Sequence, residues 1–222
     1  MQNQTGSMQT PFSTPYLSHN CSRLKLTVLM LLTLWLSGCV TAPKPEAAHS
    51  ESQRQSLWKT HQQQLKALDD WSLKGRLGLR VPGQSGSLSL EWQQNNGQYL
   101  IYLDGPLGQS VAKIKGQSGA VELEASGQRY SGVSPEGLLF ELTGWDLPVS
   151  LLRYWVVGLP SPESDSNIQL NNQGYPALIS QQGWQVEYLQ YKDFSGVTLP
   201  ARIKVRQGEV QATLFARSWE LK

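Results

Sequence analysis

From residue 71 onward, apolar and polar residues alternate with a period of two. In one such run, Leu88, Leu90 and Trp92 alternate with polar residues. This period places apolar side chains on one face of a β-strand and polar side chains on the other. Turn signals such as Pro82-Gly83 and Asn95-Asn96-Gly97 separate the runs. The pattern predicts about ten or eleven antiparallel strands, at 71–81, 87–92, 98–103, 109–115, 120–125, 128–131, 167–170, 178–182, 185–191, 201–206 and 209–218.

Three segments have a helical pattern instead. Residues 57–70 carry apolar residues at helical spacing among Gln, Lys and Asp, which predicts one amphipathic helix. Ser134-Pro135-Glu136 is a start signal for a second, short helix. A third begins at Pro148 and ends at Gly158. The second and third helices interrupt the series of strands.

A single sheet of this size must curl to bury its apolar face. The fold class is therefore mainly β with short helices, as an incompletely closed antiparallel β-barrel of about 11 strands with a helical lid over a hydrophobic cavity. Two packed sheets are the alternative. Composition alone does not decide between a filled core and an open cavity. If a cavity is present, the candidates for its lining are Leu90, Trp92, Ile101, Leu103, Leu139, Leu142, Leu152, Trp155, Val186, Tyr188 and Leu214.

The N-terminal region contains a run of thirteen residues, Leu24 to Leu36, that is almost entirely apolar and follows Arg23 and Lys25. A basic start, a short apolar run and a small-residue cleavage site define a secretory signal. A membrane span would need about 20 apolar residues. The run ends in Leu-Ser-Gly-Cys39, which resembles the lipobox of bacterial lipoproteins. We therefore expect residues 1–38 to be removed and Cys39 to be lipidated.

Residues 39–56 are rich in Pro, Ala, Ser, Glu and Gln and lack an apolar period. This composition predicts a flexible tether between the lipid and a domain at 57–222. Val40 follows Cys39, at the position where an Asp is the usual signal for retention in the inner membrane. Its absence favours the outer membrane, with the domain facing the periplasm.

Charge and residue content exclude several function classes. The full chain has 19 Lys and Arg against 17 Asp and Glu, and removal of Arg23 and Lys25 leaves 17 of each. A neutral domain argues against a nucleic-acid partner. No His or Cys occurs from residue 71 onward, so a Ser-His or Cys-His nucleophile has no components. Phosphate-loop, dinucleotide and metalloprotease motifs are also absent, and neither a cofactor nor a metal is expected.

Carboxylate pairs are the remaining candidates for catalysis. Glu122 and Glu124 share one face of a predicted strand, and Lys113 and Lys115 lie on the strand before it. Cross-strand charge pairs on a solvated sheet face explain all four residues. The sequence therefore predicts that the protein is not an enzyme.

Several motifs resemble the LolB family of lipoprotein receptors. They include Trp58-Lys59-Thr60-His61-Gln62-Gln63, Pro106-Leu107-Gly108, Gly127-Gln128-Arg129-Tyr130, Leu142-Thr143-Gly144, the run Leu152-Arg153-Tyr154-Trp155-Val156-Val157-Gly158-Leu159-Pro160, and Trp219. The Leu-Arg-x-Trp-x-x-Gly-Leu-Pro run is specific, whereas the Pro-Leu-Gly turn is weak by itself. The resemblance extends from the lipobox through nearly all of the mature chain.

The resemblance implies an open β-barrel with a helical lid and a role as the last acceptor in lipoprotein sorting. The periplasmic carrier LolA would deliver a triacylated lipoprotein, and this monomeric chain would insert it into the inner leaflet of the outer membrane without ATP. Pro106, Leu107 and Gly108 match the protruding loop of the family, which is tied to membrane insertion. The alternative is a structural envelope lipoprotein, a scaffold with a filled β-core and no acyl-chain transfer.

Overall fold

The computed structural model describes residues 49–143 and 147–222. Cys39, the signal segment and residues 39–48 of the expected tether lie outside the described residues. The elements in chain order are α2 (Glu51–Lys66), β1 (Trp71–Val81), β2 (Gln84–Asn95), β3 (Gln98–Asp104), β4 (Ser110–Gln117), β5 (Ala120–Ala125), β6 (Gln128–Gly132), α3 (Pro135–Thr143), α4 (Val149–Trp155), β7 (Ser166–Leu170), β8 (Pro176–Gln181), β9 (Trp184–Phe194), β10 (Val197–Gln207) and β11 (Val210–Leu221).

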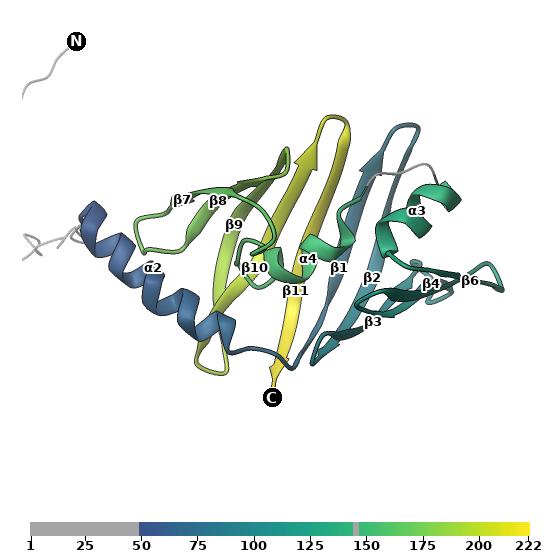
Figure 1. The fold of residues 1–222 in the computed structure, drawn as a ribbon, viewed down its shortest axis with the longest axis horizontal. Coiled ribbons are helices and arrows are strands. Elements are labelled where there is room, and N and C mark those ends of the chain that lie inside the picture. The colour runs from purple at the N-terminus through teal and green to yellow at the C-terminus, as the bar shows by residue number, and fades with distance from the viewer. Residues whose placement is uncertain (1–48, 144–146) are drawn as a thin grey trace, which may run out of the picture. The chain divides into compact units, whose positions relative to one another are not determined.

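The eleven strands of the described residues form one sheet, in the order β6-β5-β4-β3-β2-β1-β11-β10-β9-β8-β7 (Figure 1). Every neighbouring pair is antiparallel, and β1 pairs with β2 on one side and with β11 on the other. β6 and β7 are the two edges, so the sheet does not close. The predicted incompletely closed antiparallel barrel is confirmed. Among the described residues, no helix is both long and apolar enough to span a bilayer.

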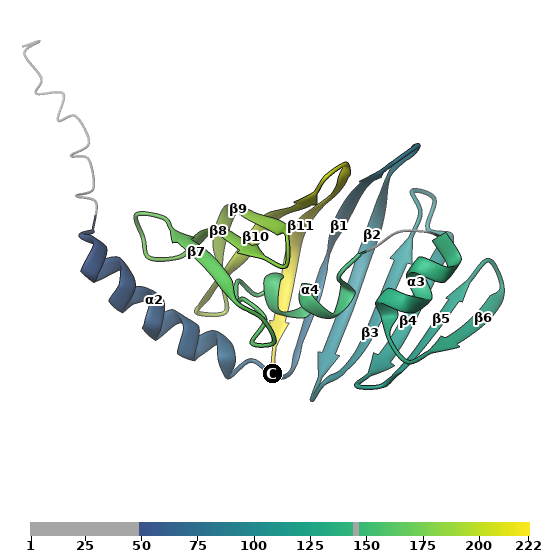
Figure 2. The same cartoon turned by 45° about the horizontal axis from the view of Figure 1, so that its top comes forward.

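The chain passes from one sheet edge to the other through the two short helices. β6 and β7 are consecutive strands in the chain but lie at opposite edges, so their connection has to cross the sheet. α3 and α4 form this connection and lie over one face of the sheet (Figure 2). Topology therefore places the two helices as a lid.

The core lies between the sheet and these helices. Trp71 of β1 belongs to it, with ring-centroid distances of 5.5 Å to Trp92 and 5.1 Å to Trp219. Leu73, Val186 and other inward residues are fully buried. The period of two along each strand therefore directs the apolar side chains toward this core.

The first helix begins earlier than the sequence analysis predicted. α2 starts at Glu51 because Ser50 and Gln53 form a capping box, in which each side chain bonds the other's backbone N–H. The prediction of a tether through residue 56 is therefore wrong for residues 51–56. The helix also ends at Lys66, before Asp70. Asp70 instead accepts a hydrogen bond from the N–H of Asn96 in the β2–β3 turn, at 3.1 Å.

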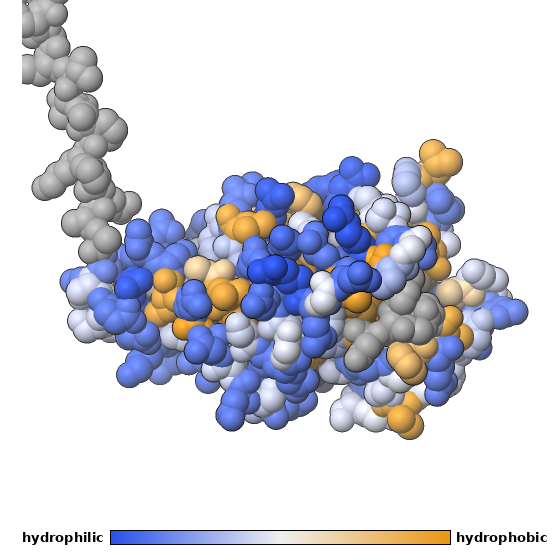
Figure 3. Space-filling view, turned by 90° about the horizontal axis from the view of Figure 1, so that it is seen from above, coloured by the Kyte–Doolittle hydropathy of each residue, from blue (hydrophilic) through white to orange (hydrophobic). Residues whose placement is uncertain are grey.

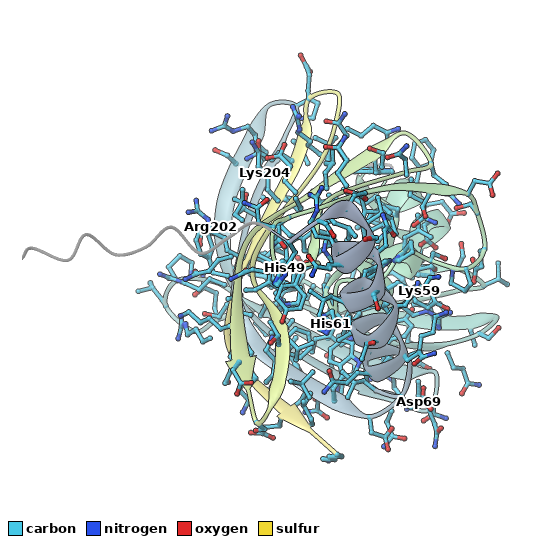
Figure 4. The ribbon with its side chains drawn as sticks, turned by 90° about the vertical axis from the view of Figure 1, so that its left-hand side faces the viewer. His49, Lys59, His61, Asp69, Arg202 and Lys204 are labelled. Carbon is cyan, nitrogen blue, oxygen red and sulfur yellow. The ribbon has the colours of Figure 1, made fainter. Side chains whose placement is uncertain are left out.

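α2 packs on the sheet through aromatic contacts. His61 is buried and contacts the ring of Tyr175 at 4.7 Å, and Tyr175 stacks on Tyr191 at 5.1 Å. Figure 4 shows His61 on the side of α2 that faces the sheet, with Lys59 on the opposite side of the helix. Arg54 adds a hydrogen bond to the carbonyl of Leu170. The neutral imidazole thus acts as a packing group at this interface.

Candidate functional site

α4 and the residues after it are firmly attached to the sheet. Trp155 is completely buried at the end of α4, and Leu151, Val156, Val157 and Leu159 are buried with it. Gly158 adopts a φ of +94°, the left-handed conformation that ends the helix at its predicted stop. At about 1.5–3 kcal/mol for each fully buried side chain, this segment contributes strongly to the core.

A buried amide fixes the same segment by hydrogen bonds. The side-chain oxygen of Gln181 in β8 accepts bonds from the indole Nε1 of Trp155 at 2.9 Å and from the N–H of Ser161 at 3.0 Å. Its Nε2 donates to the carbonyls of Ser161 and Ser164. Tyr188 of β9 donates to the carbonyl of Trp155 at 2.9 Å. α4 is therefore the fixed part of the lid.

α3 is attached much more weakly. Leu138 is its one buried hydrophobic residue among the described residues, and it packs with Val121 and Leu123 in a small cluster separate from the main core. On the same helix Phe140 is 58% exposed and Leu142 is 38% exposed. Figure 3 shows hydrophobic residues at the surface at its right-hand end, where Figure 1 places α3. Among the described residues, α3 therefore contributes one buried hydrophobic side chain to the packing, and its displacement breaks few core contacts.

The two lid helices are joined at their first turns. The backbone N–H of Ser150 at the start of α4 donates to the carboxylate of Glu136 at the start of α3. Ser134 caps α3 by accepting from the N–H of Gly137 at 3.1 Å, which confirms the predicted start signal. The N-terminal end of α3 is therefore fixed, and its C-terminal part carries the exposed apolar residues.

A cavity of about 180 Å³ lies between this fixed end of the lid and the inner face of β2–β4. Its lining includes Trp92, Tyr99, Ile101, Val133, Arg153 and Glu163. Trp92 and Ile101 are the two predicted lining residues found here, and they are cross-strand partners. Ligand pockets usually measure about 300–1,000 Å³. The cavity is therefore too small for whole acyl chains while the lid is in this position.

The other predicted lining residues occupy different places. Leu90, Trp155, Val186, Tyr188 and Leu214 are buried in the packed core. Leu103 and Leu152 are partly buried against it, Leu139 of α3 is partly buried, and Leu142 is exposed. The strand alternation correctly identified inward positions, but it could not distinguish a packed interior from an open one. The interior is more completely filled than a wide cavity would be.

The sequence analysis did not single out two polar residues, Gln181 and Tyr99. Gln181 lies in a strand whose pattern gives no signal for a buried amide. Tyr99 shares the inward face of β3 with Ile101, so the alternation could have identified it. Burial, reinforced by nearby Glu136 and opposed by Arg153, raises the pKa of Tyr99 to about 12. Its hydroxyl therefore stays protonated at neutral pH and can donate a hydrogen bond.

The predicted protruding loop lies between β3 and β4. The N–H of Gly108 bonds the carbonyl of Gly105 at 2.9 Å, and the N–H of Gly105 bonds the carbonyl of Gln109 at 2.8 Å. The Gln109 side chain also accepts from the N–H of Leu107 at 3.1 Å. Leu107 itself is 94% exposed. The backbone is thus held in a tight turn that presents a leucine to the surroundings.

Two other features, a polar groove and a set of opposite charges on β4 and β5, do not suit apolar ligands or catalysis. An open groove of about 500 Å³ beside the β8–β9 turn is lined mainly by polar residues such as Asp165, Ser180 and Gln182. Glu124 and Glu122 lie opposite Lys113 and Lys115 in the register of β4 and β5, as the charge pattern predicted. In residues 49–143 and 147–222, no group of three His, Cys, Asp or Glu side chains could hold a metal ion.

The fold is similar to that of two solved structures. One is a DUF1329 family protein from Desulfovibrio piger, with a TM-score of 0.52 and 8% identity over 77% of this chain and 92% of that chain. The other is a LolA superfamily protein from Nitrosomonas europaea, with a TM-score of 0.50 and 7% identity over 76% of this chain and 93% of that chain. At this identity the likeness concerns the fold alone.

Sequence comparison identifies the family. The family model described as "Outer membrane lipoprotein LolB" matches residues 69–219. The outer-membrane lipoprotein LolB of Pseudomonas aeruginosa strain LESB58 is 44% identical over 199 residues, which cover 89% of this chain and 97% of that protein. The LolB of Pseudomonas syringae pv. syringae is 41% identical, over 89% of this chain and 96% of that protein. The chain therefore belongs to the LolB family of outer-membrane lipoproteins.

Proposed function

We propose that this protein is a lipid-anchored receptor that accepts triacylated lipoproteins from the periplasmic carrier LolA. It then inserts them into the inner leaflet of the outer membrane. The observation that carries the proposal is the weak attachment of α3 over an apolar sheet face, where Leu138 is its one buried hydrophobic residue among those described. Such a helix can leave an apolar surface that acyl chains then cover.

Shielding is the main physical requirement of this function. Each methylene buried from water contributes roughly 0.8 kcal/mol, so three acyl chains cannot cross an aqueous space uncovered. The 180 Å³ cavity cannot hold them, and α4 is fixed by Gln181 and by its buried residues. Acceptance of a client therefore proceeds by displacement of α3 from β5 and β6.

Release uses the loop and the anchor. Leu107 projects from a turn fixed by backbone hydrogen bonds, and moving an exposed leucine into lipid contributes about 1.5–3 kcal/mol. Lipidation of Cys39 keeps the domain at the outer membrane, facing the periplasm. A Cys39→Ala variant is expected to fold and to leave the membrane fraction.

Transfer proceeds without ATP, down a gradient of affinity from carrier to receptor to bilayer. The receptor therefore binds acyl chains more tightly than LolA does, yet loosely enough to release them. We expect it to work as a monomer. Its balanced mature charge argues against a nucleic-acid partner. Neither enzymatic activity nor a cofactor is required by this scheme.

The alternative that the sequence leaves open is a structural scaffold with a filled core and no acyl-chain transfer. A fluorescent apolar probe and an acylated client distinguish the two. The receptor should bind the probe in competition with the client and take the client from LolA. A protein that does neither is a scaffold, and the receptor proposal fails.

A further inference from the structure

Three buried polar atoms that have no hydrogen-bond partner among the described residues belong to residues that line the 180 Å³ cavity. They are Nε1 of Trp92, the hydroxyl of Tyr99 and Nε of Arg153. Buried polar groups in native proteins are nearly always hydrogen-bonded, so three unpaired groups on one cavity require an explanation. Each of the three can donate a hydrogen bond, and two of them can only donate.

The orientation of these residues is fixed by their neighbours. The Tyr99 ring lies over its cross-strand partner Gly116, where a Cβ would come within 2.3 Å of the hydroxyl oxygen. The Trp92 ring packs against Trp71 at 5.5 Å. Arg153 uses Nη2 for a 2.6 Å bond to the Tyr154 hydroxyl and for an ion pair with Glu163 at 3.8 Å. The donors are therefore held in place with their hydrogen-bonding capacity unused.

The surroundings define the chemistry of the occupant. Ile101 and Val133 make part of the lining apolar, which suits an uncharged acceptor. The charged residues of the lining are Arg153 and Glu163, which form an ion pair at 3.8 Å, so the cavity offers no net positive charge to a phosphate or carboxylate. Carbonyl oxygens attached to hydrocarbon satisfy both conditions.

We propose that this cavity binds the ester and amide carbonyl oxygens that join the acyl chains of a client to its modified cysteine. The inference rests on the proposed function and adds a polar subsite to it. The lining runs from the turns at Gly97 and Gly119, at the end of the sheet, to Trp92 and Ile101 in the core. A head group at the turns would direct its chains inward, and the small volume admits the carbonyl region without the chains.

The test compares a diacylglyceryl-cysteine peptide with a dialkyl ether analogue of equal chain length, which lacks the ester carbonyls. Binding to the full mature lipoprotein is measured for both. The wild-type protein should prefer the ester, and Tyr99→Phe should reduce that preference about 3- to 10-fold, as expected for one lost hydrogen bond. Tyr102→Phe is the matched control, because Tyr102 directly follows Ile101 and so points to the outer face of β3, where Lys113 covers its ring at 5.6 Å.

A structural role for the Tyr99 hydroxyl would give a different result. Because this hydroxyl has no partner among the described residues, Tyr99→Phe should leave the urea midpoint of unfolding unchanged or raised. Arg153→Lys provides a second variant, which keeps the positive charge but removes Nε. An unchanged ester-to-ether ratio in both variants would overturn the subsite. Failure of the wild-type protein to bind either peptide would instead overturn the proposed function.

Discussion

The indole Nε1 of Trp155 donates a 2.9 Å hydrogen bond to the side-chain oxygen of Gln181, and both residues are buried. Trp155 ends the lid helix α4, and Gln181 ends strand β8, so this bond joins the lid to the sheet. The same amide also bonds Ser161 and Ser164. Acyl chains therefore encounter a lid with one fixed helix and one weakly held helix.

Replacing Gln181 tests how firmly α4 is fixed. Gln181→Leu leaves the Trp155 indole and the Ser161 N–H buried without partners, which should lower the free energy of unfolding by about 2–4 kcal/mol. Gln182→Leu is the matched control, since Gln182 is exposed and bonds only the Ser164 hydroxyl among the contacts described. Urea denaturation gives both values. Equal effects of the two substitutions would show that α4 is held by packing alone.

A disulfide that locks α3 to β6 tests whether α3 has to be displaced before the protein can accept a client. A Cβ at Gly132 of β6 would lie 3.5 Å from the Cβ of Leu138, within the range for a disulfide. The oxidised Gly132→Cys, Leu138→Cys protein should lose most of its acceptance of an acylated client from LolA. Reduction of the same protein should restore it, which makes the reduced form the control. Full acceptance by the oxidised form would place the entry route elsewhere.

A substitution at the protruding Leu107 tests whether acceptance of a client and its release to the membrane are separate steps. Leu107→Glu should leave transfer from LolA to the receptor unchanged and reduce delivery of the client to vesicles at least tenfold, because a carboxylate resists entry into lipid. Leu189→Glu is the control, because Leu189 of β9 is also exposed, at 49%. Loss of acceptance in Leu107→Glu would assign Leu107 to the carrier interface or the acyl site.

Acid should weaken the attachment of α2. Burial lowers the pKa of His61 below its ordinary value of 6.5, against a smaller opposing hydrogen bond from Gln64. Below pH 6.5 the unfolded chain therefore binds a proton that the folded chain resists, and stability falls as the pH falls. His61→Phe should lose less stability than the wild type between pH 7.5 and 5.5 in urea titrations. His49→Phe, at an exposed position, should behave like the wild type.

Much of the fold could be predicted because strand period and turn residues are local signals. The open eleven-stranded sheet, the start of α3 at Ser134 and the helix stop at Gly158 all follow from such signals. The start of α2 was also encoded locally, in Ser50 and Gln53, but the polar composition of the segment concealed it.

The site was less predictable because it depends on contacts between distant segments. Nothing near Gln181 in the sequence shows that its amide will meet Trp155, 26 residues away. Whether Leu90 lines a cavity or fills a core depends on how closely the lid packs, which the alternation of β2 does not encode. Leu107 was singled out through the resemblance of the Pro106-Leu107-Gly108 turn to the protruding loop of the LolB family, because a Pro-Leu-Gly turn is a weak signal by itself.

In the proposed function, acyl chains pass through this protein from LolA to the membrane without ATP. The most direct measurement incubates a complex of LolA and a triacylated client with vesicles that carry the lipidated protein, in the absence of nucleotide, and follows the client by flotation. The client should move into the vesicle bilayer, and it should stay with LolA when the vesicles carry the oxidised Gly132→Cys, Leu138→Cys protein. Equal transfer to vesicles that lack the protein, or no transfer with the wild-type protein, would show that the protein does not carry the acyl chains to the membrane.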